Sequence, residues 1–263
     1  MDFCDEYEHK IENVLYFPRS IPSREAEKLY PEVLSCDCRN ECSIQNCGCF
    51  KNSGSVYKYE NVLDIESYKL QEIKPELPLF ECNMNCSCSK EICGNRLVQY
   101  GPRKGLMVKP CSNTHKGLGL FTTTSINAGN FVCEYAGEVL TETEAKTRFE
   151  LYKELYKMNY ILCVNEIFDR YKLKTFIDPT IYGNIGRYIN HSCNPNCKLV
   201  IVKENNAMPI IAIFANKNLE PETEITYDYG EEQRDNSEHC SIKPCFCNES
   251  NCRKYLPLDL SLT

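Results

Sequence analysis

The sequence has no long apolar run, and none of its hydrophobic stretches approaches the ~20 residues that a membrane-spanning helix needs. Its start, Met1–Glu6, is acidic and lacks the basic and apolar segments of a signal peptide. Positive charge is also scarce, because 30 Lys and Arg face 37 Asp and Glu, for a net charge of −7. These absences argue against a membrane protein, a secreted protein and sequence-independent DNA binding, which relies on Lys and Arg. An acidic chain suits a basic peptide, although the same charge also serves solubility alone.

Cysteine, in contrast, is abundant, with 19 in 263 residues. Without an export signal we expect a reducing compartment, where thiols bind metals rather than form disulfides. Two motifs, of five and four cysteines, are Cys36, Cys38, Cys42, Cys47 and Cys49, then Cys82, Cys86, Cys88 and Cys93. Nine thiolates satisfy three tetrahedral zinc ions if three sulfurs bridge, since six terminal and three doubly used ligands supply twelve bonds. A disulfide knot is the alternative, and the missing signal peptide argues against it.

A third cysteine motif lies near the C-terminus. Cys245, Cys247 and Cys252 form C-x-C-x4-C, which is one ligand short of a tetrahedral zinc site.

Two polar stretches organise the rest of the chain. The first is Arg187–Asn196, RYINHSCNPN, and the second is Glu224–Gly230, EITYDYG. Asn, Ser and Pro punctuate the first like a loop, yet it lies between a hydrophobic lead-in and the apolar run 199–202. A loop fixed between core elements is a common place for function.

Shorter patterns predict the surrounding elements. Strands are expected over 97–100, 106–109, 160–164 and 210–214. A capping box from Thr141 to Glu144 begins a helix that ends near Met158, with Tyr152 and Tyr156 as core or half-buried aromatics. Gly117 and Gly119 let the backbone approach a ligand closely, although G-x-G alone more often marks a turn.

The N-terminal third carries less information. Residues 1–35 have no chemical motif, and three prolines there disfavour a continuous helix, so we expect an extended lead-in packed on the core. The insert from Phe50 to Glu81 is rich in turn residues, which predicts loops with a mobile tip.

Together these motifs resemble the SET-domain lysine methyltransferases of the suppressor-of-variegation class. The two polar stretches resemble the family's RFINHSC-x-PN and E-(I/L)-T-(F/Y)-D-Y signatures, and residues 131–140 resemble its E-Y-x-G-E-V segment. The nine cysteines resemble the pre-SET triangular zinc cluster, with three residues between Cys38 and Cys42 where five are common. Leu118 stands where the family frequently has Trp.

The resemblance implies a fold and a domain order. The implied fold is mostly β with few helices, made of small curved sheets around a knot-like crossing. The implied parts are a lead-in (1–35), the pre-SET zinc cluster (36–95), the SET catalytic domain (96–230) and the post-SET zinc module (231–263). In the post-SET arrangement Cys193 is the fourth ligand of Cys245, Cys247 and Cys252, which gives four zinc ions in all. The other cysteines are expected to be ordinary small residues: Cys4, Cys111, Cys133, Cys163, Cys197 and Cys240.

The resemblance also implies an activity. It is methyl transfer from S-adenosylmethionine to a lysine of a histone tail, with lysine 9 of histone H3 the expectation for this class. The implied catalytic residues are Tyr229, Tyr227 and Tyr160, and the implied donor-binding residues are Lys116, Gly117, Leu118, Tyr160, Arg187, Asn190 and His191. Tyr at position 227, where the family has Phe or Tyr, implies mainly mono- and dimethylated product.

Alternatives remain open at this point. By local sequence Tyr160 equally fits a core aromatic, and His191 a structural hydrogen-bonder. Lysine 36 of histone H3 or a non-histone lysine is another target. A catalytically inactive histone-tail reader would predict damage at Asn190, His191 or Tyr229, and all three are intact. The expected setting is the nucleus and chromosome, with a histone H3 tail and chromatin as partners, a monomer, no membrane and no sequence-specific DNA contact.

Overall fold

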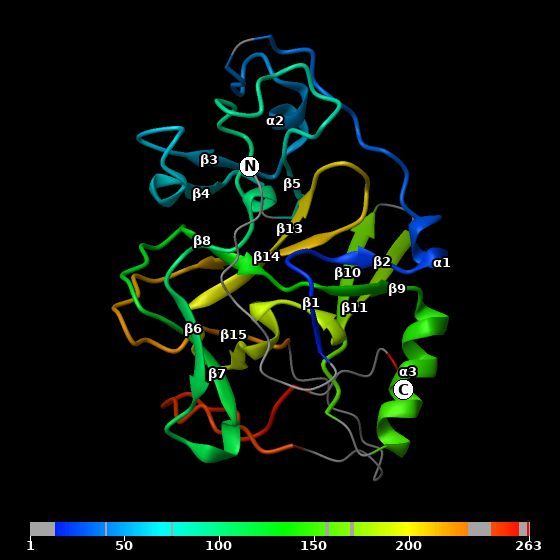
Figure 1. Cartoon of the computed structure of the whole chain (residues 1–263), viewed down its shortest axis with the longest axis vertical. Helices are drawn as coiled ribbons and strands as arrows, with labels where there is room; N and C mark the ends of the chain where they lie inside the picture. The colour runs from blue at the N-terminus through cyan, green and yellow to red at the C-terminus, as the bar shows by residue number, and fades with distance from the viewer. Residues whose placement is uncertain are drawn as a thin grey trace.

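The computed structural model describes residues 14–39, 41–74, 76–155, 158–168, 171–230, 243–257 and 262, and these form a mostly β protein (Figure 1). Its α-helices are α1 (Arg24–Glu27), α2 (Gly48–Asn52) and α3 (Glu142–Glu154). Among the described residues, no helix is both long and apolar enough to cross a membrane. The expectation of many short strands with few helices is confirmed.

In the first sheet, the N-terminal lead-in forms two edge strands. Its order is β1–β11–β9–β2, with β10 also paired to β11. The bounds are β1 Leu15–Tyr16, β2 Ile21–Pro22, β9 Gly137–Leu140, β10 Leu162–Phe168 and β11 Tyr171–Gly183. The lead-in strands pair in parallel, Leu15 with Tyr182 and Ile21 with Glu138. The described part of the lead-in therefore packs on the core as expected, and it is extended except for the short helix α1; residues 1–13 lie outside the described ranges.

The second sheet has the order β5–β13–β14–β8. The bounds are β5 Leu79–Phe80, β8 Phe131–Glu134, β13 Cys197–Lys203 and β14 Ile210–Ala215. All six residues of β14 are buried, which confirms the buried strand predicted from its apolar run. The largest core cluster contains Val139 and Ile177 from the first sheet and Ile211 and Ile213 from the second, so the two sheets share one core.

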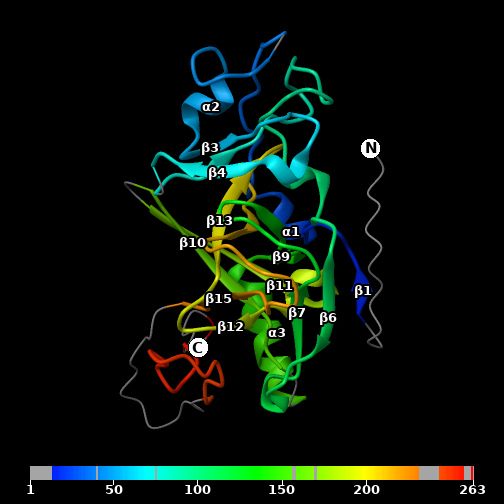
Figure 2. The same cartoon turned by 90° about the vertical axis from the view of Figure 1, so that its left-hand side faces the viewer.

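Three two-stranded sheets complete the fold. They are β3 (Ser55–Lys58) with β4 (Lys69–Glu72), β6 (Leu106–Pro110) with β7 (Leu118–Thr122), and β12 (Asn190–His191) with β15 (Thr226–Tyr227). The 3-10 turns are η1 Ile65–Ser67, η2 Val98–Tyr100, η3 Thr114–Lys116 and η4 Ile185–Tyr188. Two views show the end with α2 and the C-terminal segment at opposite ends of the long axis (Figures 1 and 2).

Helix α3 begins as the sequence predicts. Thr141 is its N-cap, and Thr141 and Glu144 form the complete capping box. The helix ends at Glu154, four residues before the expected position. Tyr152 is buried and donates its hydroxyl to Asp178 over 2.7 Å, which confirms it as a core aromatic; Tyr156 lies outside the described residues.

Three expectations are wrong. Residues 98–100 form η2, with Leu97 as its N-cap, rather than a strand over 97–100, because the buried Glu81 carboxylate accepts the Leu97 and Val98 N–H groups at 2.8 Å. The strand expected from Tyr160 begins at Leu162. The insert 50–81 is built around the β3–β4 pair rather than loops, because Tyr57 and Tyr68 join a core cluster with Phe214.

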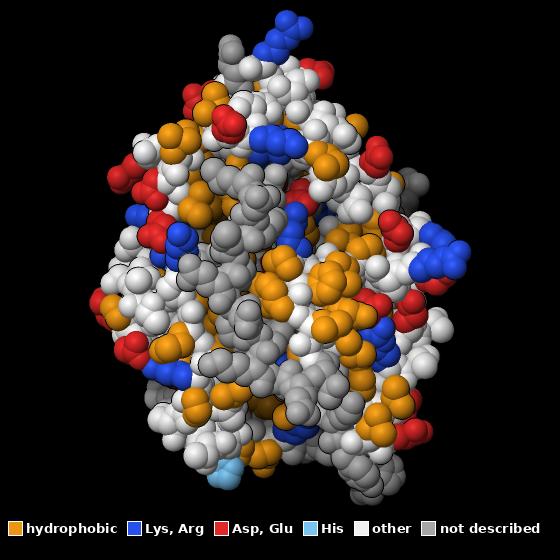
Figure 3. Space-filling view, viewed as in Figure 1, with side chains coloured by type: hydrophobic (Ala, Val, Ile, Leu, Met, Phe, Trp, Pro, Cys, Tyr) orange, Lys and Arg blue, Asp and Glu red, His pale blue; other side chains and the backbone are white. Residues whose placement is uncertain are grey.

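Charge is spread over the surface. On the face in Figure 3, Lys and Arg mingle with Asp and Glu, and neither sign covers a continuous area.

Candidate functional site

The short β12–β15 pair brings the two polar stretches together. Asn190 pairs with Thr226 and His191 with Tyr227, in parallel. Asn196 braces the junction, since its side chain donates to the Glu224 carbonyl at 2.8 Å and accepts from the Thr226 N–H at 2.9 Å. The two segments that the sequence singled out are therefore side by side.

His191 ties the first stretch to Tyr229 in the second. The Tyr229 backbone N–H donates to Nδ1 of His191 at 3.2 Å. The histidine is 4% exposed, and burial lowers its pKa to about 4; the charges of Arg253 and Lys116 act in the same direction and Asp228 opposes them. The imidazole is therefore neutral, with Nδ1 as the acceptor and Nε2 facing the Cys193 sulfur at 3.3 Å.

Tyr229 is held at both ends. Its hydroxyl donates to the Ile189 carbonyl at 2.9 Å, while its ring packs 4.9 Å from that of Tyr227 and 5.3 Å from that of His191. Burial raises the pKa of Tyr229 well above its usual value, so the hydroxyl stays protonated. Tyr227 is buried, and its ring also meets that of Tyr135 edge-on.

Glu224 sits at the centre of the predicted donor-binding residues. Its carboxylate pairs with the Lys116 ammonium and accepts from the Asn190 amide at 3.0 Å. The same amide lies 3.1 Å from the Leu118 carbonyl. Lys116, Leu118 and Asn190, far apart in sequence, are thereby joined into one network.

The two glycines beside this network differ in what they require. Gly117 has φ +69°, a left-handed conformation that favours glycine, and an added Cβ would meet open space. At Gly119 an added Cβ would lie 2.7 Å from the Cys111 sulfur and 3.0 Å from Glu224. Gly119 therefore allows a close approach that a side chain would block.

Arg187 and Tyr160 also meet. The Arg187 guanidinium lies 4.7 Å above the Tyr160 ring, and its Nε donates to the Pro179 carbonyl at 3.1 Å. Tyr135 donates its hydroxyl to the Tyr160 carbonyl at 2.7 Å. The backbone of Tyr160 is thus anchored while the residue stays half-buried.

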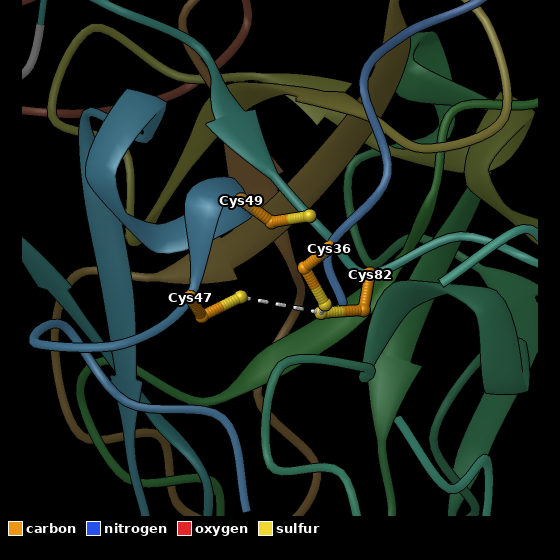
Figure 4. A group of neighbouring side chains, drawn as sticks. All are labelled: Cys36, Cys47, Cys49 and Cys82. Carbon is orange, nitrogen blue, oxygen red and sulfur yellow. Dashed lines mark hydrogen bonds between the residues drawn. The ribbon is translucent and has the colours of Figure 1, made fainter. Parts of the chain in front are cut away.

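The nine N-terminal cysteines form one cluster, part of which is drawn in Figure 4. Cys82 lies 3.9 Å from Cys47 and from Cys36, and 3.8 Å from Cys42, sulfur to sulfur. Four sulfurs bound tetrahedrally about 2.3 Å from a zinc ion lie about 3.8 Å apart. The geometry fits zinc, and no disulfide links the described cysteines.

The cluster also has the shared thiols that bridging requires. Its candidate ligand groups are Cys36, Cys47, Cys49 and Cys82; Cys36, Cys38, Cys42 and Cys47; and Cys36, Cys42, Cys82 and Cys88. Cys42, Cys47 and Cys82 each belong to two of these groups, and Cys36 belongs to all three. Cys86 lies 3.8 Å from Cys49, and Cys93 is buried in the same cluster.

The C-terminal cysteines close over the site. Cys193, Cys245, Cys247 and Cys252 have sulfurs within 4.8 Å of one another, as the post-SET expectation requires. The same tail places Phe246 on His115, with ring centroids 4.7 Å apart and nearly parallel. The tail therefore contacts both the first polar stretch and the segment before Gly117.

Sequence reasoning misses several residues of this site. Glu224 belongs to a motif that assigns it no role, and Cys111, expected to be an ordinary residue, faces Glu224 and Asn190 at 3.4 Å. The His115–Phe246 stack and the contacts of Arg253 have no sequence signal, because they depend on where the tail folds back.

A β-rich fold with a pre-SET-like thiol cluster and paired INHSC and TYDY strands defines the SET class. Comparison bears this out: the Pre-SET motif matches residues 2–96 and the SET domain matches residues 117–230. The chain belongs to the SET-domain family of histone-lysine N-methyltransferases.

Its relatives agree. The chain is 39% identical over 233 residues to a probable histone-lysine N-methyltransferase, set-23, of Caenorhabditis briggsae, covering 88% of this chain and 90% of the relative. The methyltransferase domain of human SETMAR has a TM-score of 0.76 at 31% identity, over 95% of this chain and 91% of that one. KRYPTONITE, solved with methylated DNA, an H3(1-15) peptide and SAH, has a TM-score of 0.72 at 26% identity, over 96% and 49%.

Proposed function

We propose that this chain transfers methyl groups from S-adenosylmethionine to lysine 9 of histone H3, forming mainly mono- and dimethyl-lysine. The observation that carries the proposal is the joining of Asn190, His191 and Tyr229 through the β12–β15 pair. A protein that only binds histone tails would not need a tyrosine hydroxyl next to the segment that binds the methyl donor.

The chemistry sets what the residues must do. A lysine amine attacks only when neutral, and its usual pKa is about 10.4. Partial desolvation beside the buried ring of Tyr227 disfavours the charged amine. Beyond that, the site has to align the nitrogen with the methyl group. We assign Tyr229 the catalytic position, with Tyr227 and Tyr160 lining the lysine channel.

The donor residues follow from the network around Glu224. S-adenosylmethionine supplies a methyl group on a positively charged sulfur, and SAH, held by KRYPTONITE, is what remains after transfer. The donor would contact the backbone of Gly117 and Leu118 and the charge of Lys116. Gly119 has no side chain, which leaves room beside these residues. Asn190, His191, Arg187 and Tyr160 complete the donor site.

Tyr227 is assigned control of the product. Among the described residues its hydroxyl has no hydrogen-bond partner, so it is free to bind the incoming amine. Such a bond, direct or through water, holds one orientation and fills the space of a further methyl group.

Zinc is assigned a structural part. The nine cysteines from Cys36 to Cys93 would hold three ions, and Cys193, Cys245, Cys247 and Cys252 a fourth. A closed thiolate site supplies folding energy rather than Lewis-acid chemistry. The fourth would fix the tail over the catalytic stretch.

The substrate assignment rests on the net charge of the chain and on a similar solved structure. The acidic chain suits a basic tail, and KRYPTONITE was solved with an H3(1-15) peptide. We place the chain in the nucleus on chromatin, acting as a monomer.

A peptide array with labelled donor tests the substrate. We expect label on H3 peptides that contain lysine 9, and loss of label when that lysine is replaced by arginine. Label confined to peptides around lysine 36 of histone H3, or to non-histone peptides, would overturn the assignment of the target lysine and leave the activity standing.

A further inference from the structure

Arg253 contacts the residues on both sides of Tyr229. Its Nη2 lies 2.5 Å from the Asp228 carboxylate and its Nη1 donates to the Gly230 carbonyl at 3.0 Å. Asp228 and Gly230 are the immediate neighbours of Tyr229. One guanidinium therefore bridges the residue before the tyrosine and the residue after it.

The same residue is fixed to the C-terminal cysteine cluster. Arg253 follows Cys252, and its backbone N–H donates to the Cys193 sulfur at 3.3 Å. The tail holds its shape through backbone bonds, Cys245 N–H to Lys254 carbonyl at 2.8 Å and Leu256 N–H to Lys243 carbonyl at 2.9 Å. Arg253 thus projects from a small, internally bonded hairpin.

Arg253 also packs against the other polar stretch. Its Nη2 lies 3.3 Å from Nε2 of His191; because Nδ1 of this neutral ring accepts the Tyr229 N–H, Nε2 carries the proton, and this approach is a packing contact rather than a hydrogen bond. An exposed ion pair alone contributes little to stability. Here the planar guanidinium of Arg253 contacts a carboxylate and a carbonyl at the same time, which the ammonium group of a lysine cannot do with the same geometry.

We propose that Arg253 is a positioning residue that transmits the order of the C-terminal thiol cluster to Tyr229. Arg253 does not contact the reacting atoms. It fixes the backbone on both sides of Tyr229 and thereby orients the Tyr229 hydroxyl. It follows that a tail separated from Gly230 by twelve residues should affect the chemistry. The inference rests on the proposed function for its kinetic test, but not for its structural one.

The structural test is amide hydrogen exchange of the full zinc-loaded chain. The Tyr229 amide, bonded to His191, is the direct reporter. Arg253→Ala should speed its exchange about tenfold, since charge-assisted hydrogen bonds are lost, while amides of β14 keep their rates and the zinc content is unchanged. Unchanged exchange at Tyr229, with zinc retained, would overturn the proposal.

The kinetic test separates positioning from binding. Arg253→Ala should lower kcat about tenfold with KM for donor and peptide within about twofold, and Arg253→Lys should fall between, because lysine reaches one acceptor rather than two. Glu249→Ala is the matched control: it removes another tail contact, to Asn194 at 3.2 Å, and should keep wild-type kcat. A change in KM with kcat intact would contradict positioning.

A double-mutant cycle adds a check. Asp228→Asn combined with Arg253→Ala should be no slower than Arg253→Ala alone, because Arg253→Ala already removes the Asp228–Arg253 ion pair that Asp228→Asn weakens. Full additivity would contradict it. If the wild-type chain methylates no histone peptide, the proposed function fails, and the exchange measurement still decides whether Arg253 holds Tyr229.

Discussion

The backbone N–H of Tyr229 donates to Nδ1 of His191 over 3.2 Å. This bond joins the two polar stretches across 38 residues of sequence, and the buried, neutral state of His191, whose pKa is lowered to about 4, leaves Nδ1 free to accept it. The tyrosine hydroxyl is held separately by the Ile189 carbonyl. Tyr229 is thus oriented by the first stretch at both ends.

Tyr229→Phe should abolish most turnover while donor binding persists. The substitution keeps the ring and backbone but removes the hydroxyl to which we assign the catalytic role. Activity with labelled donor and calorimetry with unlabelled donor measure the two effects. Loss of donor binding together with activity would mean that Tyr229 has a structural role instead.

Glu224→Gln should weaken donor binding. It removes the charge that pairs with Lys116, while the amide can still contact Asn190, so we expect KM for the donor to rise about tenfold and kcat to change less. Glu222→Gln is the matched control, because Glu222 pairs with Lys109 on the surface. Equal effects of the two substitutions would show that Glu224 acts only through general charge.

Tyr227→Phe should raise the higher methylation states without abolishing activity. Removing one hydroxyl opens space in the channel, and a difference of ~1.4 kcal/mol already changes a rate tenfold. Mass spectrometry of product peptide over time measures the ratio. If the variant changes only its melting temperature, Tyr227 is a packed core aromatic and nothing more.

Cys252→Ser should remove one zinc ion of the predicted four and most activity, with the N-terminal cluster retained. Losing a ligand frees the tail, and with it the contacts of Arg253 and Phe246. Elemental analysis before and after the substitution, beside an activity assay, measures both. Full activity in this variant, or one zinc or none in the wild type, would remove the account of tail closure.

Tyr152→Phe should lower the free energy of unfolding by about 1–3 kcal/mol, because the buried carboxylate of Asp178 loses its hydroxyl partner. Arg148, 3.1 Å from the same carboxylate, keeps it paired. Urea unfolding measures the change, and kcat should stay at the wild-type value. A large loss of activity without loss of stability would place Tyr152 in the site.

The sequence predicts well where chemistry is local. Thr141 and Glu144 place the start of α3, and the apolar run 210–214 identifies β14, because each depends on capping or burial within a few residues. The nine N-terminal cysteines are anticipated by their spacing and ligand count, whereas Cys193 joins Cys245, Cys247 and Cys252 only through the family resemblance.

Prediction fails where a residue far away in the sequence determines the local structure. Residues 97–100 have strand-like composition, but Glu81 accepts the N–H groups of Leu97 and Val98, and residues 98–100 form η2. The insert 50–81 carries turn residues, yet Tyr57 and Tyr68 are drawn into the core with Phe214. Arg253 offers no motif at all, because its partners come from segments that only the folded chain brings near.

The most direct test of the account is mass spectrometry of a histone H3 tail peptide incubated with the zinc-loaded chain and S-adenosylmethionine, with Tyr229→Phe run in parallel. The account predicts mono- and then dimethylation at lysine 9 of the peptide by the wild type and almost none by the variant. Unmodified peptide from a folded, zinc-loaded wild type, or equal methylation by the variant, would contradict it.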